Sequence, residues 1–131
     1  MTLSYELGRF AEDKAAEYLL SLGWKILGRN IRNTYGELDI TAFDTNAVPE
    51  ELVIVEVRCR TVGKIQTPLD SIGSRKLRTL LRSSQEYVDK LGWSGFWRID
   101  AIAITIHNKH DRECWELKHI KDITVGRTIC F

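Results

Sequence analysis

Charged side chains interrupt an apolar segment in the middle of the chain, the stretch VIVEVRCR at residues 53–60. Successive side chains of a β-strand point to opposite faces, so residues two positions apart share a face. With this period, Glu56 and Arg58 lie together on one face and Glu56 need not be buried among the valines. The opposite face carries small apolar side chains: Val53, Val55, Val57 and Cys59. The sequence therefore predicts a strand that is anchored by one face and presents an acid and a base on the other.

A second carboxylate is predicted to lie beside Glu56. The stretch ELDITAF at residues 37–43 places Leu38, Ile40 and Ala42 on one face and Glu37, Asp39 and Thr41 on the other. If the two strands pair, Asp39 and Glu56 come close, and close carboxylates repel each other unless a cation neutralises them. Mg²⁺ prefers oxygen ligands and needs only one or two carboxylates. The pattern favours a Mg²⁺ site, open also to Mn²⁺, that could activate water beside a phosphate.

Ordinary surface charge is the alternative interpretation of these acids. Glu56 and Arg58 could form an ion pair on their shared face. A third acid, Glu12, shares a helix face with Gly8 in the segment 4–22, where it could be directed at the same carboxylates or pair with a neighbouring base. Both interpretations stay open on residue pattern alone.

Seven elements must position these residues, in the order αβββαββ. Periodicity predicts helices over 4–22 and 74–91 and strands over 24–32, 37–43, 53–60, 98–106 and 114–120. The second helix is long enough to cross over and lay the next strand parallel to the third. We therefore expect one α/β domain, residues 1–131, with a mixed sheet flanked by helices.

Composition limits the function classes. Hydrophobic residues make up 44% and charged residues 28% of the chain, which is typical of soluble globular proteins. The chain shows no membrane-spanning run and no export signal, so we expect a cytoplasmic protein without a membrane partner. Its three separated cysteines argue against a zinc site or a disulfide framework. Because the net charge is only +1, any nucleic-acid binding would depend on local clusters of bases.

Several short motifs occur in an order that resembles a known family. They are GRFAEDKAAEYLLSLGWKILGRN, GELD, EVRCR, Lys76 and RID, and they extend from Gly8 to about Ile106. Together they resemble the YraN-like family, which is similar to Holliday-junction resolvases and to the PD-(D/E)XK, or restriction-endonuclease-like, nuclease superfamily. The resemblance implies a three-layer restriction-endonuclease-like core and a Mg²⁺-dependent phosphodiesterase.

The resemblance also implies catalytic roles for four residues. Glu12 matches the helix glutamate of the resolvase branch, and Asp39 and Glu56 match the acids that bind the metal. Arg58 stands where the motif usually has lysine. Arginine is a planar fork that stays charged, whereas lysine is a compact charge whose pKa can fall on burial. Arg58 can therefore stabilise phosphate charge but is a poor base.

This departure leaves three possibilities for the activity. Catalysis is altered, or Lys64 or Lys76 supplies the missing charge, or the site binds nucleic acid without cutting it. We accordingly expect either a resolvase-like endonuclease or a non-catalytic nucleic-acid-binding module. A protein-interaction scaffold on a degenerate nuclease fold is the third alternative.

Basic residues near the predicted site are candidates for contacts with phosphates. They are Arg60, Lys64, Arg75, Lys76 and Arg78. Cations in the first turn of a helix oppose the helix dipole, so their presence in 74–91 hints at a ligand such as phosphate. The alternative is a solvated helix face. The expected partner is nucleic acid, with DNA favoured over RNA, and the resemblance to resolvases implies a homodimer.

Overall fold

The structure is a computed structural model that describes residues 3–62, 73–108 and 113–124, with side chains from residue 5 onward. Lys64 lies outside these residues. The described chain forms α1 (Leu3–Ser21), β1 (Lys25–Arg32), β2 (Glu37–Asp44), β3 (Glu51–Thr61), α2 (Ser74–Leu91), β4 (Trp97–Ile106) and β5 (Trp115–Ile120). The predicted order αβββαββ is confirmed. Neither helix is long and apolar enough to cross a membrane, within these described ranges.

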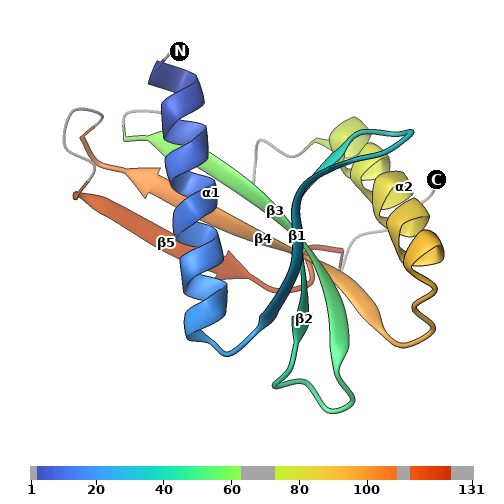
Figure 1. Cartoon of the computed structure of the whole chain (residues 1–131). Helices are drawn as coiled ribbons and strands as arrows, with labels where there is room; N and C mark the ends of the chain where they lie inside the picture. Colours follow the sequence, from blue (N-terminus) through green and yellow to red (C-terminus); the bar gives the residue numbers. More distant parts are fainter. Residues whose placement is uncertain (1–2, 63–72, 109–112, 125–131) are drawn as a thin grey trace.

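The five strands form one mixed sheet in the order β1-β2-β3-β4-β5 (Figure 1). Neighbouring strands are antiparallel except β3 and β4, which are parallel. A parallel pair needs a crossover connection, and α2 lies between these two strands in the chain. The predicted α/β architecture, a mixed sheet with flanking helices, is therefore confirmed.

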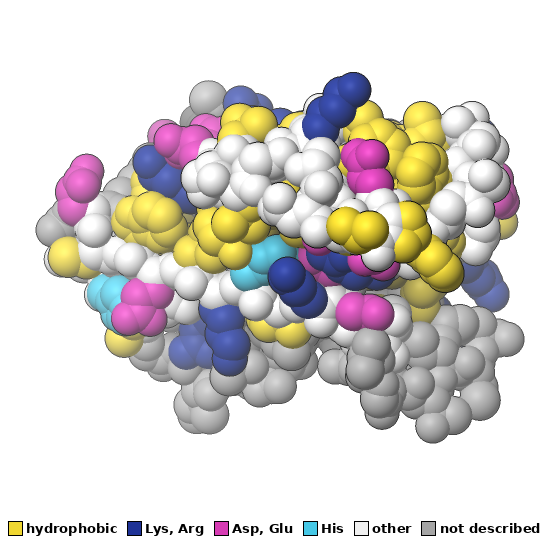
Figure 2. All heavy atoms as spheres, turned by 90° about the horizontal axis from the view of Figure 1, so that it is seen from below, with side chains coloured by type: hydrophobic (Ala, Val, Ile, Leu, Met, Phe, Trp, Pro, Cys, Tyr) yellow, Lys and Arg dark blue, Asp and Glu magenta, His cyan; other side chains and the backbone are white. Residues whose placement is uncertain are grey.

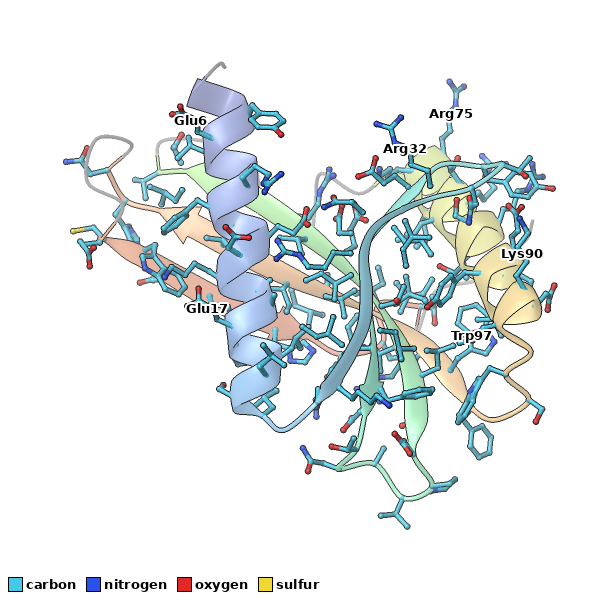
Figure 3. All side chains as sticks on the ribbon, viewed as in Figure 1. Glu6, Glu17, Arg32, Arg75, Lys90 and Trp97 are labelled. Atoms are coloured by element: carbon cyan, nitrogen blue, oxygen red, sulfur yellow. The ribbon has the colours of Figure 1, made fainter. Side chains whose placement is uncertain are left out.

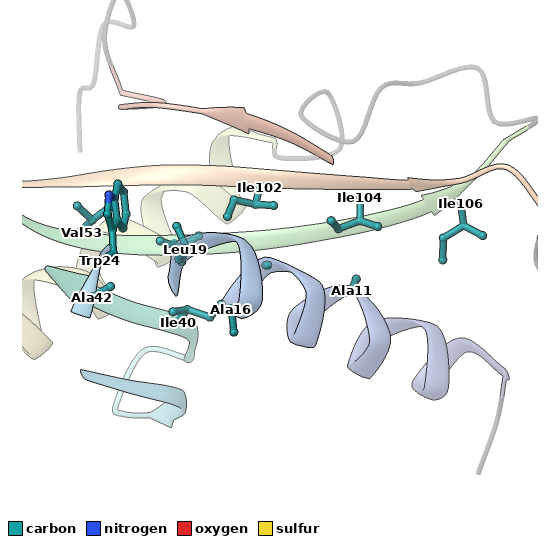
Figure 4. Packing of buried hydrophobic residues seen from close by; sticks show 12 residues of the cluster. Ala11, Ala16, Leu19, Trp24, Ile40, Ala42, Val53, Ile102, Ile104 and Ile106 are labelled. Carbon is teal, nitrogen blue, oxygen red and sulfur yellow. The ribbon is translucent and has the colours of Figure 1, made fainter. Parts of the chain in front are cut away.

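The two helices cover opposite faces of the sheet. Val53 and Val55 pack in one buried cluster with α1, whereas Ile54, between them on β3, packs in another with α2. Alanines at the α1 interface let the helix lie close to the sheet, opposite Ile102 and Ile104 of β4 (Figure 4). β4 lies between β3 and β5 and contributes apolar side chains to both clusters, as expected of a strand that is covered on both faces.

One predicted face of β2 is wrong at a single residue. Ile40 and Ala42 pack in the α1 cluster as expected, but Leu38 packs in the α2 cluster beside Leu77. The last described pair between β2 and β3 is Ile40↔Val55, so Leu38 lies beyond the paired segment. There the β1–β2 hairpin turns away toward α2 (Figure 1), and the strand twist carries Leu38 to the other side of the sheet.

A buried ionic network joins four strands at the other end of the sheet. Arg98 contacts the carboxylates of Asp44, Glu51 and Asp100, each at 2.9 Å. Asp100 is fully buried and also contacts His119 Nε2 at 2.8 Å. Arg98 and Asp100 share a strand face by alternation, and the network extends from this pair to β2, β3 and β5.

We expect the substitution Arg98→Ala to lower the free energy of unfolding by about 3–5 kcal/mol, because it leaves buried carboxylates without the cation that pairs with them. Urea denaturation followed by circular dichroism measures this change. The control is Arg32→Ala, since the Arg32 side chain is 86% exposed and its ion pair with Glu37 should contribute little. A loss below about 1 kcal/mol in Arg98→Ala would contradict the structural role of the network.

Candidate functional site

Asp39 and Glu56 meet where β2 and β3 part. Continuing the β2–β3 register one step past Ile40↔Val55 places Asp39 opposite Glu56. The Val57 backbone N–H donates to Asp39 Oδ2 at 2.8 Å. The side chain of Asp39 thus takes the place of the backbone acceptor that Val57 loses when the strands diverge. The local fold therefore holds this carboxylate at the start of the gap between the strands.

Glu56 is deeply buried beside Asp39, which is partly exposed. Glu56 lies on the sheet face that α2 covers and is only 3% exposed, so it is buried after all, although away from the valines. Burial, followed by the proximity of Asp39, raises the pKa of Glu56 to about 7. Burial also raises the pKa of Asp39, against the opposing effect of the Val57 hydrogen bond. A divalent cation beside the two carboxylates would offset the charge that their surroundings disfavour.

Two cationic side chains approach Glu56 from different elements. Arg58 Nη1 lies 3.5 Å from Glu56 Oε1, and Lys76 Nζ, from the first turn of α2, lies 3.7 Å from the same oxygen. The sequence placed Arg58 here by alternation and offered Lys76 as one of two candidate lysines. The structure brings Lys76 to the acid pair, so an amine and a guanidinium both face it.

Glu12 is buried at the inner face of α1 and makes contacts that its sequence did not predict. Asn30 Nδ2 donates to Glu12 Oε1 at 2.8 Å, and Arg29 Nη2 lies 3.2 Å from the same oxygen. Burial raises the pKa of Glu12, and the Asp39 carboxylate raises it further, so the two acids feel each other's charge. The alternative of a surface acid paired with a neighbouring helix base is wrong, because Lys14 pairs with Glu17.

Arg29 and Asn30 are site neighbours that sequence reasoning missed. Both lie on β1, where the only signal was Gly28 inside an otherwise regular strand. A glycine within a strand is typical of a bulge, which shifts every later side chain to a new partner.

A cavity of about 530 Å³ opens beside the acids, between α1 and the strands that it covers. Glu12 and Asp39 line it, together with Tyr5, Gly8, Arg9, Ala11, Asn30, Arg32, Glu37, Val57 and Cys59. Burial raises the pKa of the Cys59 thiol. Cys59 lies on the valine face, as predicted, and also borders the cavity. The cavity thus connects Glu12 on one side with Asp39 on the other.

The predicted phosphate-contacting residues divide between two elements. Arg75, Lys76 and Arg78 are exposed at the start of α2, and Arg60 is half-buried near the end of β3. Figure 3 shows Arg75 and Arg32 extending from the same end of the molecule. The face seen from below in Figure 2 instead intermixes apolar, acidic and basic side chains. Exposed bases are therefore available on the side of the molecule where α2 begins.

The donor set of the site suits some metals and excludes others. Among the described residues, no group of three or more His, Cys, Asp or Glu side chains has the arrangement of a metal centre. Zn²⁺ sites commonly take three or four protein ligands. Mg²⁺ is commonly bound by one or two carboxylates and completed by water. Asp39 and Glu56 therefore match Mg²⁺ in number and chemistry.

Comparison with known proteins adds the family. A family model described as "Uncharacterised protein family UPF0102" matches residues 11–104. A UPF0102 protein of Chlorobium chlorochromatii is 36% identical over 119 residues, which cover 89% of each chain. A UPF0102 protein of Marinobacter nauticus is 39% identical over 103 residues, 78% of this chain and 80% of that one.

A third relative has a similar extent. The UPF0102 protein of Mycobacterium tuberculosis is 35% identical over 120 residues, 90% of this chain and 91% of that protein. The family model covers the second half of α1, then β1, β2, β3 and α2, and most of β4. The chain therefore belongs to the UPF0102 family, which is the YraN-like family that its sequence motifs indicated.

Proposed function

We propose that this protein binds nucleic acid and hydrolyses phosphodiester bonds with the help of Mg²⁺. The observation that supports the proposal is the acid pair of buried Glu56 and partly exposed Asp39, with Lys76 and Arg58 within 3.7 Å and 3.5 Å of Glu56. Perturbed carboxylates beside a cavity are typical of functional sites. A restriction-endonuclease-like core is the finer architecture that we propose for the α/β fold.

Asp39 and Glu56 are the residues that would hold the cation. When bound, Mg²⁺ supplies a Lewis acid that polarises a phosphoryl oxygen and makes nearby water more acidic. Both acids have raised pKa values, so the cation would compete with protonation of the pair. The Val57 N–H fixes Asp39 Oδ2 and thereby fixes the direction of one ligand oxygen.

The two cations beside Glu56 would have different roles. Lys76 carries a mobile ammonium that is about half exposed, so it can reach a phosphate or a water in front of the acids. Arg58 is less exposed and presents a fixed fork, which suits stabilisation of charge on the phosphate. We therefore assign to Lys76 the role that the motif lysine has in the nuclease superfamily, and to Arg58 a supporting electrostatic role.

Exposed bases would position the nucleic acid. Arg75 and Arg78 lie on the same first turns of α2 as Lys76, and Arg60 lies two residues beyond Arg58 on β3. Contacts of this kind fix register on the phosphate backbone and weaken as salt rises. DNA as the preferred nucleic acid and assembly as a homodimer remain predictions.

The activity itself is tested with labelled duplex, single-stranded, flap, four-way-junction and RNA substrates, each with Mg²⁺, Mn²⁺ or EDTA. We expect metal-dependent cleavage by the wild-type protein and a loss of at least about 10³-fold in Asp39→Asn and Glu56→Gln, because both ligands are needed for charge stabilisation. Asp89→Asn, on the exposed face of α2, is the matched control. The assignment is wrong if cleavage and cation binding survive in both site variants.

Stability should depend on pH and on the cation together. Glu56 ionises near pH 7 when folded and near pH 4.5 when unfolded, so the folded state loses up to about 3 kcal/mol as pH rises between these values. Glu56→Gln should remove most of this loss. Mg²⁺ should raise the Tm of the wild-type protein by several degrees at pH 8, little at pH 5, and not at all in Glu56→Gln. Thermal unfolding measures all three, and an equal Mg²⁺ effect in both proteins would contradict the ligand assignment.

Lys76 and Arg58 can be separated by substitution. We expect Lys76→Ala to reduce single-turnover cleavage by about 10²-fold, because it removes the only lysine that the described structure brings to the acid pair. Arg58→Lys should raise cleavage, because it restores the usual motif residue. Lys90→Ala, at the far end of α2, is the control.

Arg58 also favours a second candidate function, a nucleic-acid-binding module without cleavage. In that case neither wild type nor Arg58→Lys cuts any substrate, while both bind DNA with a strong salt dependence. Absence of binding to both DNA and heparin would instead favour the protein-interaction scaffold.

A further inference from the structure

An extra residue in β1 sets which side chain faces Asp39. The β1–β2 register runs Lys25↔Phe43 and Ile26↔Ala42, then resumes at Gly28↔Thr41, so Leu27 has no partner of its own. This is the pattern of a β-bulge, with two residues on one strand opposite one on the other. A Cβ atom at Gly28 would lie 2.9 Å from Ile31 Cδ1, so a larger residue there would require the Ile31 side chain to shift.

The bulge changes the partner of Asp39. Beyond it, Arg29 pairs with Ile40 and Ile31 with Leu38, which places Asn30 opposite Asp39. The register before the bulge would have placed Arg29 there instead. A guanidinium opposite Asp39 would neutralise the carboxylate that the cation site needs. Asn30, Asp39 and Glu56 instead form one row across β1, β2 and β3.

Asn30 occupies this position with an unusual backbone. Its φ is +51°, a left-handed conformation that few residues other than glycine and asparagine adopt readily. Its side-chain Nδ2 donates to Glu12 Oε1 at 2.8 Å. Such conformations cost free energy and cluster at functional sites. The left-handed backbone of Asn30 thus accompanies the hydrogen bond from its side chain to Glu12.

Every contact of Glu12 with the described residues ends on the same oxygen. Asn30 Nδ2, Arg29 Nε and Arg29 Nη2 approach Oε1 at 2.8, 3.3 and 3.2 Å. Arg29 Nη2 is also held by Asp13 at 2.6 Å. Within the described part of the chain, Oε2 has no hydrogen bond or ion pair, and Glu12 lines a cavity together with Asp39. Glu12 is therefore a side chain held through Oε1, while Oε2 makes no hydrogen bond or ion pair with the described residues.

We infer that Asn30 is a positioning residue, which holds Glu12 through Oε1 so that Oε2 faces the reacting phosphate or water beside Asp39. This inference rests on the proposed function, because it gives Glu12 a role in that reaction. It assigns the bulge and the left-handed residue to the site and not to the packing of the sheet.

The first part of the test needs no cation and no nucleic acid. The unfolding equilibrium constant is measured by urea denaturation for Asn30→Gly, Glu12→Ala and the double variant. Glycine keeps the left-handed backbone and removes only the donor. We expect the combined effect to fall short of the product of the single effects by about fivefold or more, because the two residues share one interaction. A deviation below about twofold would overturn the inference.

The second part separates positioning from folding. In Asn30→Gly we expect single-turnover cleavage to fall by at least about 10-fold, while DNA affinity and the Tm increase caused by Mg²⁺ stay within twofold of wild type. Asp122→Gly makes the same change at the other non-glycine residue with a left-handed backbone in the described ranges, φ +48°, and should leave cleavage unchanged. Cleavage by Asn30→Gly at the wild-type rate would overturn the inference. If wild type cuts nothing, the proposed function fails, and the unfolding cycle alone decides whether Asn30 holds Glu12.

Discussion

Repulsion between Asp39 and Glu56 is the constraint around which the neighbouring residues are arranged. The strands that carry them part at this point, where Glu56 is buried and Asp39 borders the cavity. Val57 donates its amide to Asp39, and Arg58 and Lys76 approach Glu56 from two directions. The pKa values of both acids nevertheless stay raised, chiefly because of burial and, for Glu56, also because of the Asp39 charge.

A second buried acid shows what complete compensation looks like. Burial alone would raise the pKa of Asp100, but hydrogen bonds from His119, Arg98 and the Asp122 N–H outweigh it, and the pKa is lowered. Glu56 is nearly as buried, and its pKa moves the opposite way. The protein itself satisfies the hydrogen bonds of Asp100, which stabilises the fold. Glu56 is not compensated in this way and can still bind a ligand. The same sheet therefore contains a structural carboxylate and a candidate functional one.

Local patterns predicted much of this structure, and long-range geometry accounts for the rest. Periodicities of 2 and 3.6 residues gave the element order, the two faces of β3 and the pairing of the strands that bear Asp39 and Glu56. The burial of Glu56 was not predictable, because alternation does not say what covers the polar face. The turn of Leu38 toward α2 and the contacts of Asn30 depend on where strands diverge and where a register shifts, and neither has a period in the sequence.

The bulge in β1 makes the number of residues in that strand as important as their types. Gain of one residue between Ile26 and Gly28, with the bulge and the Lys25↔Phe43 pair kept, would leave every side chain present, yet it would replace Asn30 with Arg29 opposite Asp39. An insertion in this short segment would therefore act on the chemistry of the site, whereas elsewhere on a protein surface insertions usually change only loop length. When sequences of this family are aligned, a change in the length of β1 therefore bears on the site even where the residue types are the same.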